Sequence, residues 1–434
     1  MQDVRSRREF LRRAMICLGA AVPFGAGTIL RSGEAPARKR SANERLRIGV
    51  IGAGGRGGEN LQGVQSEDIV AICDVDRNVL ANGGKAFPGA RTYEDFRRVL
   101  DHKDLDAVVI STPDHMHAIP AAAALRAGLD VYCEKPLAHS VHEVRTLREL
   151  TAKERRVTQM GTQIHAGDNY RRVVEAVKGG VVGPVRRVHV WMDGRPQLGK
   201  RAVDSTPPSH INYDLWLGPA PYRPYHPSSF HFTWRHWWDF GNSVLGDFGC
   251  HYMDLPFWAL DLHAPLTVEA VGKKDHDGDN DVPGLLRADY HFPARGSLPP
   301  VHLTWYHGGW KPPGAEVYKR GSAVLFEGDR GRIVADYGSR DVYMDTGLDA
   351  PAMPAASIPE SIGHHREWIE AVKTRGPTTC DFEYSGELTE AVLLGNAAYR
   401  SGKKLEWDAL ALKAPNAPEA NPFLRREYRA GWTL

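Results

Sequence analysis

The sequence predicts an α/β protein with two domains, the first of which is a doubly wound parallel sheet. Short apolar strands alternate with helical segments between residues 46 and 165, and a glycine-rich turn directly follows the first strand. The chain of 434 residues is also longer than one hydrophobic core usually supports. Hydrophobic residues make up 42% and charged residues 25%, a balance that is ordinary for packed globular domains.

The first strand, residues 46–51, leads into the turn Gly52-Ala53-Gly54-Gly55-Arg56-Gly57. In a G-x-G-x-x-G turn the first glycine allows a tight bend, the second lets the backbone approach a pyrophosphate, and the third lets the next helix pack closely on the strand. We expect that helix at residues 58–64, where its first amides would face the phosphates. Strand, glycines and helix in this order predict a dinucleotide-binding domain over residues 46–165.

A second apolar strand, residues 69–73, ends in Asp74. An acidic residue about 20 positions beyond the glycines binds the ribose hydroxyls of adenosine in such domains. Its negative charge would repel a 2′-phosphate, so the sequence predicts NAD as the cofactor. Arg77 lies close to this carboxylate and leaves NADP as an alternative.

The alternation of strands and helices continues along the chain. We expect a helix at 93–100, a strand at 105–110, a helix at 118–127, a strand at 130–133, a helix at 141–153 and a strand at 156–160. Ligands of such a sheet bind at the carboxyl ends of its strands. Five polar residues follow those ends and are candidates for the site: Thr112, His117, Glu134, Lys135 and Gln163.

Two short motifs extend this interpretation. In Thr112-Pro113-Asp114-His115-Met116-His117 and in Glu134-Lys135-Pro136-Leu137 the sequence resembles the glucose–fructose oxidoreductase/inositol dehydrogenase/rhizopine catabolism (Gfo/Idh/MocA) family. The resemblance covers nearly the whole chain after the N-terminal segment. It implies an NAD-dependent sugar oxidoreductase, whose cofactor-binding residues would be Gly52, Ala53, Gly54, Gly55, Arg56, Gly57, Asp74, Thr112, Pro113, His117, Glu134, Lys135 and Gln163.

The resemblance also implies a substrate-binding α+β domain over residues 166–415, with an open, mostly antiparallel sheet whose exposed surface makes a homo-oligomer. Candidate strands lie at 185–191, 266–272, 286–292, 301–306, 323–327 and 332–336, and candidate helices at 364–374 and 385–400. Residues 196–232 contain seven prolines and are expected to form an extended loop. The run Tyr428 to Trp432 resembles the tail of a secreted branch of the family, and we expect residues 416–434 to pack on the domains.

A third polar motif, Asp247-Phe-Gly-Cys-His251-Tyr-Met-Asp254, lies in the second domain. If it is helical, its offsets of four and three residues place the three polar side chains on one face. Pro256 fits less well and predicts that a helix starts or kinks there. The resemblance implies a Lys135–Asp247–His251 centre over the nicotinamide, whereas Asp254 is expected to be structural.

The chemistry suits these residue types. Oxidation of a sugar hydroxyl removes its proton while hydride leaves the same carbon. We assign His251 as the acid/base, because imidazole titrates near neutrality, and Lys135 as the cation that stabilises the developing alkoxide. The reverse assignment stays open. Asp247 can set the tautomer of His251 or bridge Lys135 and the substrate.

An aromatic stretch over residues 222–240 comes just before this motif. Its rings can stack on the C–H faces of sugars or form core, and Trp234, Arg235 and Trp237 are the candidate substrate contacts. No metal is predicted, because the spacing matches no short ligand motif. The residues considered as metal ligands are His226, His231, His236, Asp247 and His251.

The N-terminal segment predicts an export signal. Residues 6–12 contain the pair Arg7-Arg8 followed by Phe-Leu, and a weakly apolar run at 14–30 comes next. This pattern is typical of a twin-arginine signal peptide, assigned here to residues 1–37 with a linker at 38–45. We therefore expect a periplasmic or secreted protein. The run is too short and too rich in glycine for a membrane anchor.

Charge and cysteine content bear on two further points, nucleic-acid binding and disulfide bonds. After residues 1–37 are removed, 49 basic and 50 acidic residues remain, which gives no electrostatic reason to expect nucleic acid as a partner. The cysteines of that part are single and scattered, which predicts buried free thiols rather than disulfides. They are Cys73, Cys133, Cys250 and Cys380.

These observations lead to three hypotheses of function. In the first, the protein oxidises a sugar or glycoside hydroxyl and uses NAD that is tightly bound, because free NAD is expected to be scarce outside the cytoplasm. In the second, it is a redox-neutral NAD-dependent glycosidase or lyase that works through a transient keto-sugar. In the third, it is a non-catalytic sugar-binding relative, which the joint presence of Lys135, Asp247 and His251 disfavours.

Overall fold

The computed structural model describes residue 41 and residues 44–195, 204–227, 233–280, 282–349 and 351–434. The predicted signal segment, residues 1–37, and most of the 38–45 linker lie outside the described residues.

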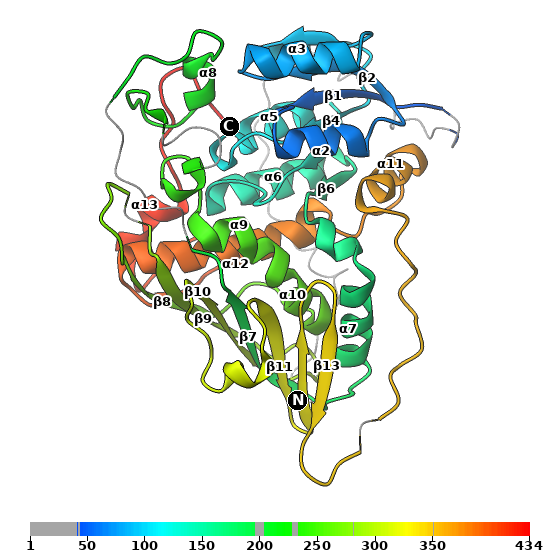
Figure 1. The fold of residues 1–434 in the computed structure, drawn as a ribbon, viewed down its shortest axis with the longest axis vertical. Helices are drawn as coiled ribbons and strands as arrows, with labels where there is room; N and C mark the ends of the chain where they lie inside the picture. The colour runs from blue at the N-terminus through cyan, green and yellow to red at the C-terminus, as the bar shows by residue number, and fades with distance from the viewer. Residues whose placement is uncertain (1–40, 42–43, 196–203, 228–232, 281, 350) are drawn as a thin grey trace, which may run out of the picture. The chain divides into compact units, whose positions relative to one another are not determined.

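Six parallel strands form the first sheet, in the order β3-β2-β1-β4-β5-β6 (Figure 1). This is the Rossmann order, in which the direction of winding reverses between β1 and β4. The prediction of a doubly wound parallel sheet is therefore confirmed. Every residue of β4 is buried, as expected for a strand covered by helices on both faces. The strands are β1 (Arg47–Ile51), β2 (Asp68–Cys73), β3 (Arg91–Tyr93), β4 (Ala107–Ile110), β5 (Asp130–Cys133) and β6 (Thr158–Met160).

Most helices that cover the first sheet lie between its strands in the sequence. They are α2 (Arg56–Gly63), α3 (Arg77–Ala86), α4 (Arg97–Leu100), α5 (Ala118–Arg126) and α6 (Val141–Glu154). Helix α6 begins with a capping box, in which Ser140 and Glu143 each satisfy the other's backbone amide.

One further helix that covers the first sheet comes from the second half of the chain. Helix α11 (His364–Thr374) packs Trp368, Ile369 and Val372 into the same hydrophobic cluster as residues of β1. A buried ion pair of 2.9 Å between Lys373 and Glu67 adds to this contact. The predicted 166–415 segment therefore does not form one separate body, since α11 covers the first sheet.

The second sheet has eight strands in the order β13-β12-β11-β7-β10-β9-β8-β14. Only β7 and β10 run parallel, and every other recorded pair is antiparallel. The prediction of a mostly antiparallel sheet is thus confirmed. The strands are β7 (Val185–Met192), β8 (Thr267–Lys273), β9 (Leu285–Phe292), β10 (Val301–His307), β11 (Ala323–Gly328), β12 (Gly331–Ala335), β13 (Arg340–Met344) and β14 (Leu405–Glu406).

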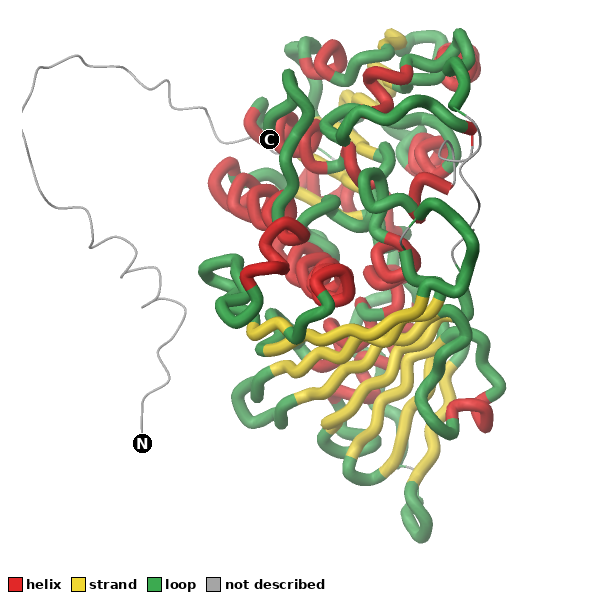
Figure 2. The backbone as a smooth tube through the Cα atoms, turned by 90° about the vertical axis from the view of Figure 1, so that its left-hand side faces the viewer, coloured by secondary structure: helices red, strands yellow, loops and turns green. Residues whose placement is uncertain are grey.

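A layer of helices lies between the two sheets (Figure 2). It contains α7 (Asp168–Lys178), α9 (Ser243–Tyr252), α10 (Asp254–Leu260) and α12 (Phe382–Ser401). Helix α12 contacts α6 on one side and α9 and β8 on the other. One hydrophobic cluster runs without a break from β4 and β5 to β9 and β10, so the domains share a core. Two short helices complete the fold, α8 (Tyr213–Leu217) and α13 (Asn421–Leu424).

Some elements differ from the sequence-based expectations. Tyr93 was expected to begin a helix but ends β3, where it pairs with Cys73 at the sheet edge. Helix α3 was not anticipated, because Gly83 and Gly84 obscure its helical pattern, yet the Asp76 side chain caps it. Helix α7 and strand β13 were also missed.

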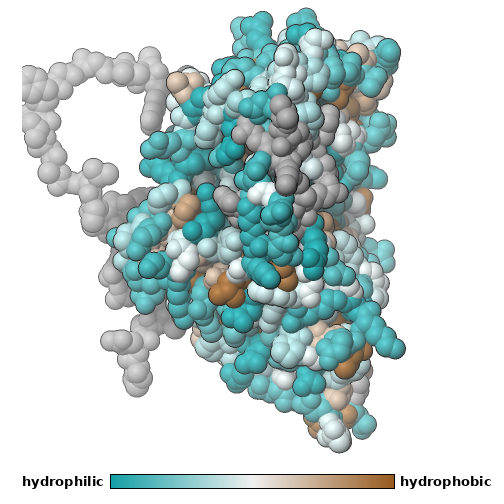
Figure 3. Space-filling view, turned by 60° about the vertical axis from the view of Figure 1, so that its left-hand side comes forward, coloured by the Kyte–Doolittle hydropathy of each residue, from teal (hydrophilic) through white to brown (hydrophobic). Residues whose placement is uncertain are grey.

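The surface and the thiols agree with a polar globular protein. Among the described residues, no helix combines the length and apolarity that a membrane span requires. The face shown in Figure 3 is mainly hydrophilic, with small separated hydrophobic spots. Cys73, Cys133, Cys250 and Cys380 are free and buried, which confirms the expectation for these thiols.

A buried histidine of the second sheet makes stability depend on pH. The indole N–H of Trp305 donates to Nδ1 of His307 at 3.0 Å, so Nδ1 must be unprotonated. Burial lowers the pKa of fully buried His307 to about 4. The unfolded chain takes up this proton near pH 6.5. The stability that the neutral ring contributes is therefore complete above pH 6.5 and is lost as the pH falls towards 4.

We expect the free energy of unfolding of the wild type to fall between pH 7 and pH 5 by about 2 kcal/mol more than that of His307→Gln. Urea unfolding of both proteins at the two pH values measures this difference. Equal losses in the two proteins would contradict the assignment.

Candidate active site

A cavity of about 710 Å³ lies along the carboxyl ends of the first sheet, a size that suits a cofactor or substrate site. On the side of the first domain its lining follows the ends of β1, β2, β4 and β5, with Gly52, Asp74, Thr112 and Lys135 among the residues. On the opposite side it is lined by residues of the second domain, which include His251. The cavity is therefore a cleft between the domains.

The glycine turn is built for close backbone contact. Gly52 has φ +82°, and a Cβ there would lie 2.7 Å from the carbonyl oxygen of Ser111. A Cβ on Gly57 would lie 2.0 Å from the carbonyl oxygen of Gly52, so this glycine serves the packing of α2. The amides of Ala53 and Gly54 donate to the Asp74 carboxylate at 2.8 and 3.1 Å. Gly52, Gly54, Gly55 and Arg56 line the cavity, whereas Ala53 and Gly57 lie behind its wall.

The far end of the cavity, beyond Asp74, is acidic. Asp76, Glu94 and Asp95 join Asp74 in its wall. Arg77, the residue that kept NADP open, is held by Glu94 at 2.7 Å and by the carbonyl of Ser209 at 3.0 Å. This end therefore opposes a 2′-phosphate and suits the ribose hydroxyls of NAD.

Glu134 ties the strand ends together. Its carboxylate accepts hydrogen bonds from Asn60 and Gln163, each at 2.8 Å, and lies 3.3 Å from Nε of Arg56. Burial alone would raise the pKa of Glu134, but Arg56 and these donors hold it below its usual range. The predicted residues Glu134, Arg56 and Gln163 thus form one network on the cavity wall.

Lys135 follows directly and points to the second domain. Its ammonium donates to the Asp247 carboxylate at 2.5 Å and to the Asp247 carbonyl at 2.6 Å. Nε of Arg235 lies 3.3 Å from the same carboxylate oxygen. Burial would raise the pKa of Asp247, yet the two cations lower it to about 2. Asp247 itself does not line the cavity, so it holds Lys135 in place from behind.

His251 lies one turn after Asp247 on α9 and lines the cavity. Burial and the neighbouring Lys135 lower its pKa to about 3, so the ring is neutral at physiological pH. Its Nδ1 is buried and has no hydrogen-bond partner among the described residues. No hydrogen bond joins it to Asp247 within that part of the chain. Within the described residues Asp247 therefore has one visible role, which is to hold Lys135; the structure shows neither a contact that would set the His251 tautomer nor access of Asp247 to a substrate in the cavity.

Asp254 does not join this face. Helix α9 ends at Tyr252 and α10 begins at Asp254, so the motif is not one continuous helix; the break lies close to Pro256, where a helix start or kink was expected. The Asp254 carboxylate binds Nδ1 of His165 at 2.9 Å and the Tyr384 hydroxyl at 2.7 Å. Asp254 is structural, as expected.

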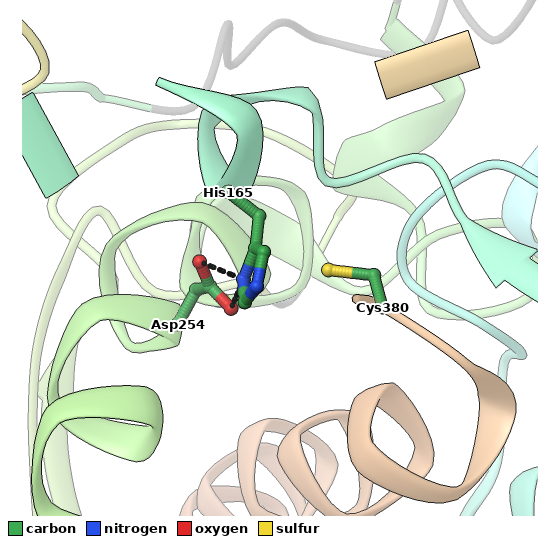
Figure 4. Close-up of side chains that lie close together, drawn as sticks. All are labelled: His165, Asp254 and Cys380. Carbon is green, nitrogen blue, oxygen red and sulfur yellow. Dashed lines mark hydrogen bonds and ion pairs between the residues drawn. The ribbon is translucent and has the colours of Figure 1, made fainter. Parts of the chain in front are cut away.

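Among the described residues, one group combines three metal-ligating residue types: His165, Asp254 and Cys380 (Figure 4). Two of them are already joined by the His165–Asp254 hydrogen bond, and His165 stacks on Trp258 at 3.9 Å. Burial raises the pKa of the Cys380 thiol well above its usual value and disfavours the thiolate that a metal needs. We interpret the group as a packed polar contact between η2 (Gln163–Ala166) and α10.

The aromatic stretch divides between the cavity and the core. Trp234 and Arg235 line the cavity, and the Arg235 guanidinium lies 4.3 Å from the centre of the Trp234 ring. Trp237 belongs to the same buried cluster as Trp234 but is absent from the cavity lining, so the structure does not bring this candidate substrate contact to the cavity. Of the histidines weighed as metal ligands, His231 lies outside the described residues.

The threonine–proline motif frames the cavity. Thr112, Pro113 and His117 line it, and the two ring nitrogens of His117 face the carbonyls of Thr112 and Pro136, each at 2.7 Å. His117 thus braces the Lys135-Pro136 segment, whose peptide bond is cis.

Sequence reasoning missed several residues of the lining. Asp114, within the same motif, is buried and receives a hydrogen bond of 3.3 Å from Asn242. Burial raises its pKa to about 6. Others include Glu94, Asp95, Phe96, Leu215, Trp216 and Trp432. No motif marks them, because they meet the cavity only through the folding of loops and of the C-terminal segment.

The fold and this cleft define a two-domain, NAD-binding protein of the oxidoreductase type. The family model for the NAD-binding Rossmann fold of the GFO_IDH_MocA oxidoreductases matches residues 46–162, and the model for their C-terminal alpha/beta domain matches residues 188–292. The chain belongs to the GFO_IDH_MocA oxidoreductase family.

Curated relatives support this membership. An inositol 2-dehydrogenase of Leifsonia xyli subsp. xyli is 36% identical over 152 residues, which are 33% of this chain and 44% of the relative. A glycosyl hydrolase family 109 protein of Solibacter usitatus is 32% identical over 199 residues, 42% of this chain and 44% of the relative. The matched part thus spans less than half the length of these relatives.

Solved structures share the fold. The WlbA dehydrogenase of Bordetella pertussis, in complex with NADH and UDP-GlcNAcA, has a TM-score of 0.62 at 16% identity and covers 84% of this chain and 99% of its own. An inositol dehydrogenase homolog of Azotobacter vinelandii, complexed with NADH and myo-inositol, has a TM-score of 0.60 at 17% identity, with coverage of 84% and 98%.

The Lys135–Asp247 pair should be strongly coupled. Asp247→Ala leaves Lys135 and Arg235 as neighbouring cations without their anion, so we expect a loss of about 3 kcal/mol in the free energy of unfolding. Adding Lys135→Met removes one of those cations, so the double variant should lose clearly less than the sum of the single variants. Urea unfolding of the four proteins measures this coupling.

The exposed pair Arg98–Asp101 serves as the control. Its coupling should stay below about 1 kcal/mol, because water screens the two charges. Additive losses for Lys135 and Asp247 would mean that the buried pair is not energetically significant.

Proposed function

We propose that this protein oxidises a hydroxyl group of a sugar or glycoside with tightly bound NAD. One observation carries the proposal. The Lys135 ammonium, held by Asp247 at 2.5 Å, and the neutral His251 ring both line the cleft that begins at the glycine turn. A neutral imidazole can accept the hydroxyl proton in alcohol oxidation, and a fixed cation near it can stabilise the developing alkoxide.

Each side chain has a defined task in this proposal. Bound NAD would accept hydride from the substrate carbon. His251 accepts the hydroxyl proton, because burial and Lys135 keep its ring neutral. Lys135 stabilises the negative charge that develops on the substrate oxygen, and Asp247 keeps its ammonium in position. Trp234 and the Arg235 guanidinium that lies over its ring both line the cleft, where they can contact the sugar.

A second candidate shares the same centre. A redox-neutral glycosidase or lyase would oxidise a hydroxyl only transiently, form a keto-sugar and cleave a glycosidic bond with no net change in NAD. The similarity to the glycosyl hydrolase family 109 protein supports it, as does the benefit that an exported protein would gain from a retained cofactor.

Activity assays separate the two candidates. We expect purified protein to release NAD or NADH on denaturation, and to oxidise sugars or polyols when a second electron acceptor is present. Cleavage of aryl glycosides without added cofactor and without net NADH would favour the second candidate. Turnover that occurs only with added NAD would contradict tight binding.

Variants test the centre itself. Lys135→Ala and His251→Asn should each lower kcat/KM at least about 100-fold, because each removes a group that acts in the transition state. The exposed Lys153→Ala provides a matched control that should keep full activity. Full activity in Lys135→Ala would refute the assigned centre.

We also propose export by the twin-arginine route and a homo-oligomer through the open face of the second sheet. The first rests on the paired arginines of residues 6–12. Replacing Arg7 and Arg8 by lysine should move the protein from the periplasmic or secreted fraction to the cytoplasmic fraction. An unchanged distribution would argue against this route.

A further inference from the structure

The far end of the cofactor cleft is closed by parts of the chain that lie outside the dinucleotide-binding domain. The segment before α8 pairs with the loop that follows Asp74: Asn212 donates from its amide to the carbonyl of Val75 at 2.8 Å and from its side chain to Glu94 at 3.0 Å. The C-terminal segment contributes Trp432 to the lining. In Figure 1 this segment runs from α13 past α8 and ends beside α5.

Trp432 is held against an aromatic ring of the first domain. Its indole stacks on Phe96, with ring centres 6.4 Å apart and planes inclined by 29°. The Arg97 guanidinium lies 5.3 Å from the centre of the Trp432 ring and 6.0 Å from that of Phe96, and these cation–π contacts help to hold the two rings together. Trp432 remains half-buried, and it lines the cleft together with Phe96.

Three side chains anchor the segment upstream of Trp432. Arg426 and Tyr428 both bind the buried Glu143 carboxylate, at 2.9 and 2.8 Å. Arg429 donates to the carbonyl of Gly218 at 3.0 Å and pairs with Asp214 at 2.5 Å. Residues 425–434, which we call the C-terminal strap, are thus tied to the start of α6 and to the end of α8.

The order of the residues along the cleft indicates which part of the cofactor the C-terminal strap would contact. Lys135 and His251 mark the reactive end, the glycine turn follows, and Asp74 marks the position of the adenosine ribose. Phe96 follows β3, the edge strand beside β2, and Trp432 stacks on it, so both rings lie on the side of Asp74 away from the glycine turn, where the purine would extend. A flat, uncharged base presents a π-face that an indole can stack on, and the indole needs no hydrogen bond for it.

We propose that Trp432 is a cofactor-binding residue: it forms the wall against which the adenine base is held, and the C-terminal strap slows the release of the dinucleotide. The proposal rests on the proposed function, because it supplies the means by which NAD would be retained. Neither Trp432 nor the strap takes part in the chemistry at Lys135.

Binding measurements test this role without reference to catalysis. Protein stripped of nucleotide is titrated with NADH and with ADP-ribose, and the dissociation rate of NADH is measured by stopped-flow fluorescence. Trp432→Ala should lower the affinity for both ligands by about 10-fold or more, because the stacking of the indole on the adenine base is lost. Trp432→Phe, which keeps an aromatic ring, should stay within about three-fold of the wild type.

Phe423→Ala is the matched control for loss of an aromatic ring. Phe423 is also half-buried under an arginine, with Arg400 at 4.3 Å from its ring centre, but it does not line the cleft. We expect unchanged NADH and ADP-ribose affinity in this variant. Removal of residues 426–434 should speed NADH release further than Trp432→Ala does.

Several outcomes would overturn the proposal. It fails if Trp432→Ala binds both ligands with the affinity of the wild type. It also fails if the variant loses affinity for NADH but not for ADP-ribose, since the effect would then lie at the nicotinamide end of the cofactor. It also fails if Phe423→Ala weakens binding equally. Failure to find any sugar substrate would sink the proposed function but would leave the adenine contact standing.

Discussion

The ion pair between Lys135 and Asp247 is the contact on which the organisation of the site depends. It joins the end of β5 in one domain to α9 in the other, with both side chains only 13% exposed. Two charges that leave water lose much of their hydration, so such a pair is weak evidence for stability by itself. Its value here is positional, because it fixes a cation in the wall of the cleft and joins an element of one domain to an element of the other.

The rest of the fold makes that arrangement rigid. One hydrophobic cluster continues from the first sheet through α6 and α12 to the second sheet. Helix α11 returns from the second half of the chain to cover β1. On the cavity wall, Glu134 binds donors from α2 and from the end of β6, and His117 braces the segment that follows Lys135. The reactive groups are therefore held by both local strand ends and distant packing.

The sequence predicted what is encoded locally. A strand, the glycine turn and Asp74 lie within about one βαβ unit, and their spacing alone reports a dinucleotide site. Lys135, Asp247 and His251 were found through short motifs. The contacts made at long range could not be found in this way. Trp234 and Trp237 lie three residues apart in one aromatic run and share one buried cluster, and only tertiary packing decides that Trp234 also lines the cavity. Trp432 reaches the cleft from the far end of the chain.

The proposed retention of NAD in an exported protein sets a demanding physical requirement. With an association rate constant of about 10⁶ M⁻¹s⁻¹, a dissociation constant of about 1 μM corresponds to a residence time of only about one second. A residence time of about an hour needs a dissociation constant of about 0.3 nM, which is a further stabilisation of the complex by roughly 5 kcal/mol. Hydrogen bonds from Asp74 and the glycine turn are common to dinucleotide-binding domains that exchange their cofactor freely. Under the proposal, the additional contribution comes from elements outside the dinucleotide-binding domain, namely the segment before α8 and the C-terminal strap.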